Sequence, residues 1–230
     1  MKNIWLRKKN ADKLLLFFNG WGMDWRIAAH LLCESISGGF NQDFLVCYDY
    51  SNLEPEPEFI HEAKHYGHVT VVAWSFGVWV AQHIELPSIE RAIAINGTLY
   101  PINDQRGISS AVFKATLSSY SEEVRDRFNR RMCGSSEALA LFSTMSPDRA
   151  VSEQKKELEQ LNEYFLSSSL SSCATWKYDH AIIGGRDLVF PAEQQYNAWK
   201  GVPQTVIADM PHFPFFHFGT LQELLVCVRK

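Results

Sequence analysis

The chain of 230 residues is 46% hydrophobic and 21% charged and carries a formal net charge of −4, which predicts one globular domain and does not favour nucleic-acid binding. Its basic N-terminal residues are not followed by a signal segment, and the first apolar run, at 14–18, is too short to span a bilayer. These features predict a cytoplasmic protein without a membrane partner.

Short apolar runs alternate with helical patterns along the chain. The runs occupy residues 14–19, 44–50, 69–74, 92–96, 178–184 and 205–210. Helical patterns between them occupy 24–35, 77–86 and 220–228. Several runs are apolar almost throughout, as is typical of parallel strands that are covered on both faces. The alternation predicts an α/β fold with a mostly parallel, doubly wound sheet.

The segment at about 107–173 interrupts this alternation because it contains no strand-like run. Its helical patterns occupy 109–117, 121–132, 136–145 and 152–166. We interpret the segment as a helical insertion between the fourth and fifth runs, with the serine-rich stretch 167–173 leading back to the sheet. The sequence therefore predicts a single domain over residues 1–230 with a helical cap.

Ser75 stands where an apolar strand gives way to a helix, in the sequence 71-VVAWSFGVW-79. A serine on a sharp strand-to-helix turn projects its hydroxyl above the sheet, and crowding there requires small residues two positions before and two positions after it. Ala73 and Gly77 meet this requirement, although glycine is commoner at the first position. The pattern is compatible with a nucleophile and also with a buried serine at a strand end.

A serine nucleophile needs a histidine base and a carboxylate that orients the base. Asp187 follows the run at 178–184 and His212 follows the run at 205–210, so each lies beyond the carboxyl end of a strand. The chain order of these residues predicts a triad of Ser75, Asp187 and His212. Rival candidates are His217 as the base and Asp49 or Asp179 as the acid.

Acyl transfer also requires hydrogen-bond donors for the oxyanion. The run at 14–19 leads into 18-FNGWGMDW-25, where two glycines allow a tight turn. We expect the backbone N–H groups of Trp21 and of Phe76, the residue after the serine, to be these donors. A plain turn would be compatible with the same sequence.

With these residues in place, the chain resembles an α/β-hydrolase over essentially its whole length, through NGWG, AWSFG, GGRD and PHFPF. More narrowly, it is similar to the pimeloyl-[acyl-carrier protein] methyl ester esterases of biotin synthesis, of the BioG type. That similarity is carried by LLFFNGWGMD, VCYDY, VVAWSFGVWVA, AINGTLYPINDQRGI, VFKATL and RFNRRMCG. It implies a serine carboxylesterase that hydrolyses the methyl ester of pimeloyl-[acyl-carrier protein] through an acyl-enzyme, with no metal or organic cofactor.

The chain departs from the common hydrolase pattern at two positions. Many hydrolases have His-Gly where this chain has Asn19-Gly20, and glycine where it has Pro211. The first departure leaves a backbone oxyanion hole possible, whereas the second could alter how His212 is presented. Because few residues precede the first run, we also expect the sheet to be shortened at that edge.

The helical pattern at 121–132 places Val124, Phe128 and Met132 on one face and its arginines away from that face. Acyl carrier proteins are strongly acidic, so the basic side chains form a candidate docking patch. Its members are Lys114, Arg125, Arg127, Arg130 and Arg131. Alternatively, the arginines belong to a solvated helix face that is balanced by Glu122, Glu123 and Asp126.

Several apolar side chains could line an acyl channel or simply pack in the core. They are Phe113, Leu117 and Phe142 of the cap and Trp21, Trp74 and Phe76 near the predicted triad. Two other functions fit the same residues. The first is a thioesterase or a carboxylesterase for small esters, and the second is a non-catalytic, hydrolase-like binding protein.

Overall fold

The computed structural model describes residues 1–167 and 174–227, and its centre is a seven-stranded sheet in the order β1-β3-β2-β4-β5-β6-β7. All neighbouring strands are parallel except β1 with β3. The strands are β1 (Lys2–Arg7), β2 (Lys13–Phe18), β3 (Asp43–Tyr48), β4 (His68–Trp74), β5 (Arg91–Ile95), β6 (His180–Gly184) and β7 (Gln204–Ile207). The predicted α/β fold with a mostly parallel sheet is confirmed.

Strand β1 forms the edge of the sheet from the few residues that precede the first predicted run. It pairs antiparallel with β3, from Lys2 opposite Tyr48 to Arg7 opposite Phe44. None of its side chains is fully buried, because an edge strand is covered on fewer sides than a central one. Its sequence, KNIWLR, begins and ends with a charged residue and lacks the continuous apolar run of the central strands.

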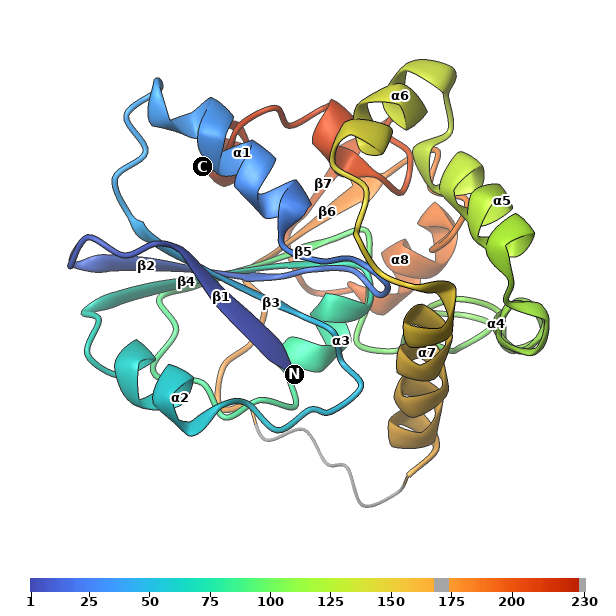
Figure 1. Ribbon diagram of the computed structural model, residues 1–230, viewed down its shortest axis with the longest axis horizontal. Coiled ribbons are helices and arrows are strands. Elements are labelled where there is room, and N and C mark those ends of the chain that lie inside the picture. The colour runs from blue at the N-terminus through green and yellow to red at the C-terminus, as the bar shows by residue number, and fades with distance from the viewer. Residues whose placement is uncertain (168–173, 228–230) are drawn as a thin grey trace.

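Helices cover both faces of the sheet (Figure 1). Helices α1 (Arg26–Ile36) and α9 (Leu221–Val226) pack together on one face, and α2 (Pro57–Ala63) and α3 (Phe76–Ala81) lie on the other. The sequence did not predict α2 or α8 (Ala192–Ala198), because neither PEFIHEA nor AEQQYNA carries an extended apolar pattern. In the described part of the chain, no helix is long and apolar enough to cross a membrane.

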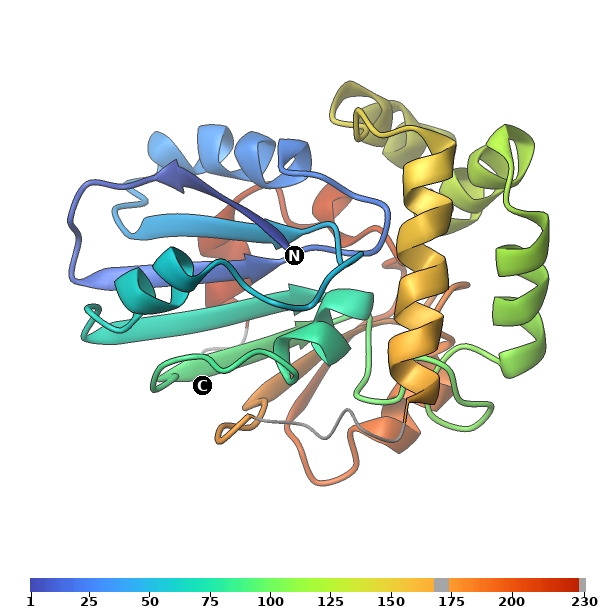
Figure 2. The same cartoon turned by 60° about the horizontal axis from the view of Figure 1, so that its bottom comes forward.

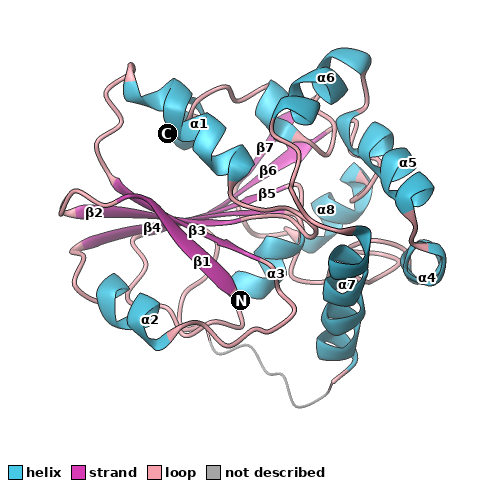
Figure 3. Cartoon of the chain, viewed as in Figure 1, coloured by secondary structure: helices cyan, strands magenta, loops and turns pink. Residues whose placement is uncertain are grey.

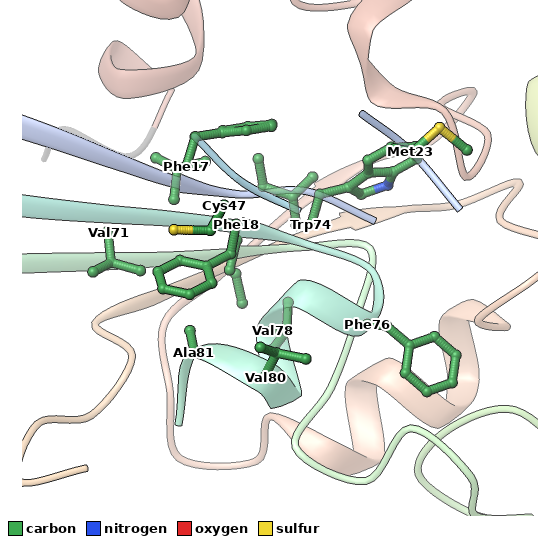
Figure 4. Close-up of a cluster of buried hydrophobic side chains, with 14 of the residues drawn as sticks. Phe17, Phe18, Met23, Cys47, Val71, Trp74, Phe76, Val78, Val80 and Ala81 are labelled. Carbon is green, nitrogen blue, oxygen red and sulfur yellow. The ribbon is translucent and has the colours of Figure 1, made fainter. Parts of the chain in front are cut away.

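The central strands are buried on both faces. Every residue of β2 from Leu14 to Phe18 has no exposed surface, and Phe17 and Phe18 project to opposite sides of the sheet (Figure 4). On one side, the ring of Phe17 packs against those of Phe44 and Phe215. Apolar burial of this kind, at roughly 25 cal/mol per Å², stabilises a rigid sheet whose strand ends carry the loops described below.

Four helices lie between β5 and β6 in the chain and gather at one end of the sheet (Figures 2 and 3). They are α4 (Ser110–Ser119), α5 (Glu122–Cys133), α6 (Ser136–Thr144) and α7 (Val151–Leu166), and they match the four predicted helical patterns. Serine caps start two of them, since Ser121 accepts the N–H of Val124 and Ser135 accepts that of Ala138. Residues 168–173 of the predicted serine-rich connection lie outside the described residues.

Candidate active site

Ser75 occupies the junction between β4 and α3, where its backbone has φ 59° and ψ −127°. Positive φ is unfavourable for a residue with a side chain and costs about 1–3 kcal/mol. The Ser75 N–H is held by the carbonyl oxygen of Ile95 at 3.0 Å. Two residues later only glycine fits, because a Cβ added to Gly77 would lie 2.5 Å from the carbonyl oxygens of Phe18 and Asn19. The structure therefore places Ser75 on a sharp strand-to-helix turn.

His212 lies in the loop between β7 and the 3₁₀ turn η1 (Pro214–Phe216). Its Nε2 is 3.0 Å from Ser75 Oγ, and its Nδ1 is 2.8 Å from Asp187 Oδ2. The imidazole is buried and stacks on the ring of Phe190, with the centroids 5.7 Å apart and an interplanar angle of 11°. When Nδ1–H donates to the carboxylate, Nε2 can accept the proton of the serine hydroxyl.

Asp187 follows β6 and is buried. Its Oδ1 accepts the backbone N–H groups of Val189 and Phe190, each at 2.8 Å. Its Oδ2 accepts Nε2 of Gln195 at 3.0 Å in addition to the histidine. These bonds hold the carboxylate in one orientation. Gln195 was not singled out from the sequence because it belongs to α8, which the apolar pattern did not reveal.

A buried asparagine at the end of β5 joins the loops that follow β6 and β7. Asn96 donates from Nδ2 to the carbonyl oxygens of Pro211 at 2.8 Å and His212 at 3.0 Å. Its Oδ1 accepts the N–H of Gly184 at 2.7 Å. Trp74 Nε1 also donates to the His212 carbonyl oxygen, at 2.9 Å. These bonds fix the backbone around Pro211. The only signal of Asn96 in the sequence was that a polar residue stands at the end of an apolar run.

The segment after β2 forms a tight turn. The N–H of Met23 donates to the carbonyl oxygen of Gly20 at 3.3 Å, and Gly22 has φ 76°, as a type II turn requires. Asn19, at the position of the commoner histidine, spans the turn. Its Oδ1 accepts the Gly20 N–H at 2.9 Å, and its Nδ2 donates to the Asp24 carbonyl oxygen at 2.7 Å. The asparagine therefore supports the turn from within.

The two predicted oxyanion donors lie beside Ser75. A Cβ added to Gly20 would be 3.4 Å from Ser75 Cβ, so the turn lies directly against the serine. Trp21 and Phe76 line the same pocket as Ser75. Within residues 1–167 and 174–227, neither backbone N–H has a hydrogen-bond acceptor. Two unpaired donors beside a serine hydroxyl can bind an oxyanion.

An apolar pocket lies above the serine and the histidine. It contains about 550 Å³ of empty space, its open mouth included. Its walls include Trp21, Trp74, Phe76, Val112, Phe113 and Val189. Two predicted channel residues do not line it, since Phe142 packs on Phe213 and Leu117 packs against the core.

Asp49, a rival acid, belongs to a separate charged cluster. It forms ion pairs with Lys2 at 2.9 Å and Arg149 at 3.2 Å. Burial raises the pKa of Asp49, but hydrogen bonds from Lys2 and Ser51 and the charge of Arg149 outweigh burial and lower this pKa to about 2. The carboxylate of Asp49 is therefore bound by Lys2 and Arg149, whereas His212 is bound by Asp187.

The other two rivals also have partners elsewhere. Asp179 accepts the backbone N–H of Ala92 at 2.7 Å, where β5 and β6 begin, which is the opposite end of the strands from Ser75. His217 lies 3.4 Å from the carboxylate of Asp209. In the part of the chain that the structure describes, no three His, Cys, Asp or Glu side chains are grouped as a metal site would require.

The candidate docking residues lie on α4 and α5. The exposed members are Lys114, Arg127, Arg130 and Arg131, and the half-buried member is Arg125. Among the described residues, none of the four arginines forms an ion pair with a carboxylate. The neighbouring acidic side chains of α5 therefore do not pair with them.

Arg131 connects this basic face with the pocket. Its Nε donates to the carbonyl oxygen of Leu188 at 2.7 Å, and its side chain lines the pocket. The opposite face of α5 is apolar and points inward, where the ring of Phe128 lies 5.4 Å from that of Trp21. Helix α5 thus presents an apolar side to the pocket and, to solvent, arginines that form no ion pair among the described residues, beside the exposed Glu122, Glu123 and Asp126.

Comparison with known proteins shows the family of this chain. The family described as pimeloyl-ACP methyl esterase BioG matches residues 1–224. The chain belongs to this family. A malonyl-[acyl-carrier protein] O-methyltransferase of Bacteroides fragilis (strain 638R) is 40% identical over 190 residues, which are 81% of this chain but 36% of that protein. The chain therefore spans about a third of that relative's length.

Solved structures support the family and the fold. A BioG structure from Haemophilus influenzae has a TM-score of 0.82 and 29% identity, over 97% of this chain and 99% of that one. An esterase from Exiguobacterium antarcticum has a TM-score of 0.68 and 15% identity, over 97% and 93% of the two chains. At that identity the likeness concerns the fold alone. The predicted α/β-hydrolase fold and the resemblance to the BioG family are both confirmed.

Proposed function

We propose that this BioG-family chain is a serine carboxylesterase that hydrolyses the methyl ester of pimeloyl-[acyl-carrier protein] in biotin synthesis. The observation that carries the proposal is the hydrogen-bonded series from Ser75 Oγ through His212 to Asp187 at the base of an apolar pocket. Family membership supports the choice of substrate. The Bacteroides relative is itself named for an acyl-carrier-protein substrate.

The proposed reaction follows from these distances. His212 Nε2 takes the hydroxyl proton as Ser75 Oγ attacks the ester carbonyl, and Asp187 stabilises the resulting imidazolium. The N–H groups of Trp21 and Phe76 bind the oxyanion of the tetrahedral intermediate. The imidazolium then protonates the departing methoxide, which leaves as methanol. His212 next activates a water molecule that hydrolyses the acyl-enzyme and releases the ω-carboxylate.

The pocket suits the middle of such a substrate. A pimeloyl chain is a run of methylene groups between two carbonyl carbons, and its apolar surface matches the aromatic walls. We propose that helices α4 to α7 form a cap over the pocket within a single domain. The methyl ester would lie at Ser75, and the thioester end would leave the pocket near Arg131.

The cationic face of α5 supports docking of an acyl carrier protein. Three arginines of the proposed patch are exposed, and none of its four arginines pairs with a carboxylate among the described residues. A strongly acidic carrier would be attracted to these charges on an enzyme whose net charge is −4. Attraction of this kind weakens as salt screens the charges.

The central test compares wild type with Ser75→Ala on pimeloyl-[acyl-carrier protein] methyl ester, with methanol release as the readout. We expect Ser75→Ala to lose activity by roughly a thousandfold or more, whereas Ser118→Ala, at an exposed serine, should match wild type. Full activity of Ser75→Ala would contradict the proposed nucleophile.

Docking is tested by reversing one charge. Arg127→Glu should raise KM for the carrier-bound ester at low salt and leave the KM for dimethyl pimelate unchanged, because only the carrier meets the patch. The control is Lys156→Glu, an equal charge change at an exposed site on α7. Equal effects of the two variants on the carrier-bound ester would argue against this docking face.

Two further readouts separate the alternatives. Release of free thiol instead of methanol from the carrier-bound ester would indicate a thioesterase, and turnover of small esters alone would indicate a general carboxylesterase. Failure of a fluorophosphonate to label Ser75 would favour a non-catalytic binding protein.

A further inference from the structure

The buried side of cap helix α7 holds the turn that carries Trp21. Gln154 donates from Nε2 to the carbonyl oxygen of Gly22 at 2.9 Å. Its own backbone carbonyl oxygen accepts the indole Nε1–H of Trp21 at 2.8 Å. Its Oε1 accepts the hydroxyl of Tyr120 at 3.1 Å, so every polar group of this amide side chain is engaged. The glutamine is buried although it comes from a mostly polar helix.

One helical turn further along α7, Glu157 has no exposed surface. Its Oε2 accepts the N–H of Gly22 at 3.2 Å, and its Oε1 accepts the N–H of Tyr50 at 2.9 Å. Arg149 forms an ion pair with this carboxylate and donates to the carbonyl oxygen of Met23 at 3.3 Å. Burial raises the pKa of Glu157, and the charge of Arg149 opposes that rise.

Both polar backbone atoms of Gly22 are therefore bound by α7. In a type II turn the central peptide plane is flipped relative to a type I turn, and the N–H of the third residue changes sides with it. Here that N–H points at the Glu157 carboxylate. The flipped alternative would turn the carbonyl oxygen of Trp21 toward the same carboxylate, which electrostatic repulsion disfavours. Glu157 thus favours the observed type II turn, and Gln154 binds the carbonyl oxygen of Gly22.

We propose that Gln154 and Glu157 are positioning residues that orient the Gly20–Met23 turn so that the Trp21 N–H faces the oxyanion. The inference rests on the proposed esterase function and extends it, because it makes a cap helix a structural part of the oxyanion hole. A buried carboxylate is costly, and this one touches neither Ser75 nor His212. Its oxygens accept instead from the N–H groups of Gly22 and Tyr50 and from the guanidinium of Arg149.

The test pairs each buried side chain with an exposed or partly exposed one of the same type on α7. Glu157→Gln is compared with Glu159→Gln, and Gln154→Leu with Gln160→Leu. An amide oxygen can serve only one of the two N–H groups that Glu157 accepts, so Glu157→Gln leaves the other unpaired. Activity is measured on pimeloyl-[acyl-carrier protein] methyl ester per fluorophosphonate-titrated active site, which removes the contribution of unfolded protein.

We expect kcat to fall roughly tenfold to a hundredfold in Glu157→Gln and Gln154→Leu, with KM within about threefold, because an oxyanion contact acts in the transition state. Affinity for butylboronic acid, whose serine adduct is tetrahedral, should fall in parallel. The pH profile of kcat should keep its shape, because His212 is untouched. Glu159→Gln and Gln160→Leu should match wild type.

Wild-type kcat in both buried variants, or a change in KM alone, would overturn the positioning role. If Glu157→Gln does not fold, Gln154→Leu decides the question by itself. Ser75→Ala, whose rate is expressed per mole of total protein because it has no serine to titrate, separates the two proposals. If Ser75→Ala is inactive while Gln154→Leu and Glu157→Gln are fully active, only the positioning role is refuted. If Ser75→Ala is fully active, both the esterase mechanism and the positioning role are refuted.

Discussion

Replacing Asn96 by glycine should loosen both loops that carry the proposed base and acid. Glycine tolerates the positive φ of 45° at this position, so the substitution removes the side-chain hydrogen bonds without adding backbone strain. The three bonds lost are those to the carbonyl oxygens of Pro211 and His212 and from the N–H of Gly184. The His212 carbonyl oxygen keeps its bond from Trp74.

Two buried groups therefore lose the partner that Asn96 supplies, the Gly184 N–H and the Pro211 carbonyl oxygen. An unsatisfied buried donor or acceptor costs about 1–3 kcal/mol, so the free energy of unfolding should fall by about 2–6 kcal/mol. That is a large part of a typical total of about 5–15 kcal/mol. We also expect kcat to fall roughly tenfold or more, because small displacements of catalytic groups are costly.

Urea unfolding and ester hydrolysis measure the two effects. The matched control is Asn10→Gly, since Asn10 also has positive φ, 57°, but is exposed. That variant should differ from wild type by only about 0.5 kcal/mol or less. The reasoning is refuted if Asn96→Gly is no less stable than Asn10→Gly and its kcat stays within about twofold of wild type.

Three further substitutions have definite expected outcomes. Gly77→Ala should lower the free energy of unfolding by about 2 kcal/mol or more, measured in urea, because its Cβ would meet carbonyl oxygens at 2.5 Å; an unchanged midpoint would contradict this. Asp49→Asn should cost about 2 kcal/mol at pH 7. Since the folded pKa of Asp49, about 2, lies below its ordinary value of 3.8, this difference in stability should persist above pH 3.8 and shrink as pH falls toward 2. Urea titrations at several pH values would show a constant difference if the reasoning is wrong. Gln195→Leu should reduce kcat roughly threefold to tenfold with little change in KM, because Asp187 loses one of its hydrogen bonds; steady-state kinetics showing a KM effect alone would count against it.

Much of the architecture was predictable because parallel central strands are buried on both faces. That burial produces continuous apolar runs, which marked the five inner strands, and a shorter apolar run marked the edge strand β7. Strand β1 was missed because its sequence, KNIWLR, has only three consecutive apolar residues between polar and charged ones. Helices α2 and α8 were missed because their sequences, PEFIHEA and AEQQYNA, carry few large apolar residues and so show no clear period of 3.6 residues.

Residues that follow strand ends were also accessible from the sequence. The carboxyl ends of parallel strands meet at one edge of a sheet, so Ser75, Asp187 and His212 could be expected to lie together from chain order alone. The sequence thus determined the α/β fold and which side chains meet at that edge, through the short-range rules of strand burial and strand-to-loop junctions.

Only the tertiary structure decided what holds those side chains in place. Asn96 bonds to a carbonyl oxygen 116 residues away, and Glu157 to a backbone N–H 135 residues away. In the sequence these residues are an ordinary strand-end amide and a helical carboxylate. Their roles depend on which loops and which helix end the folded sheet brings beside them, and local periodicity contains no record of such long-range contacts.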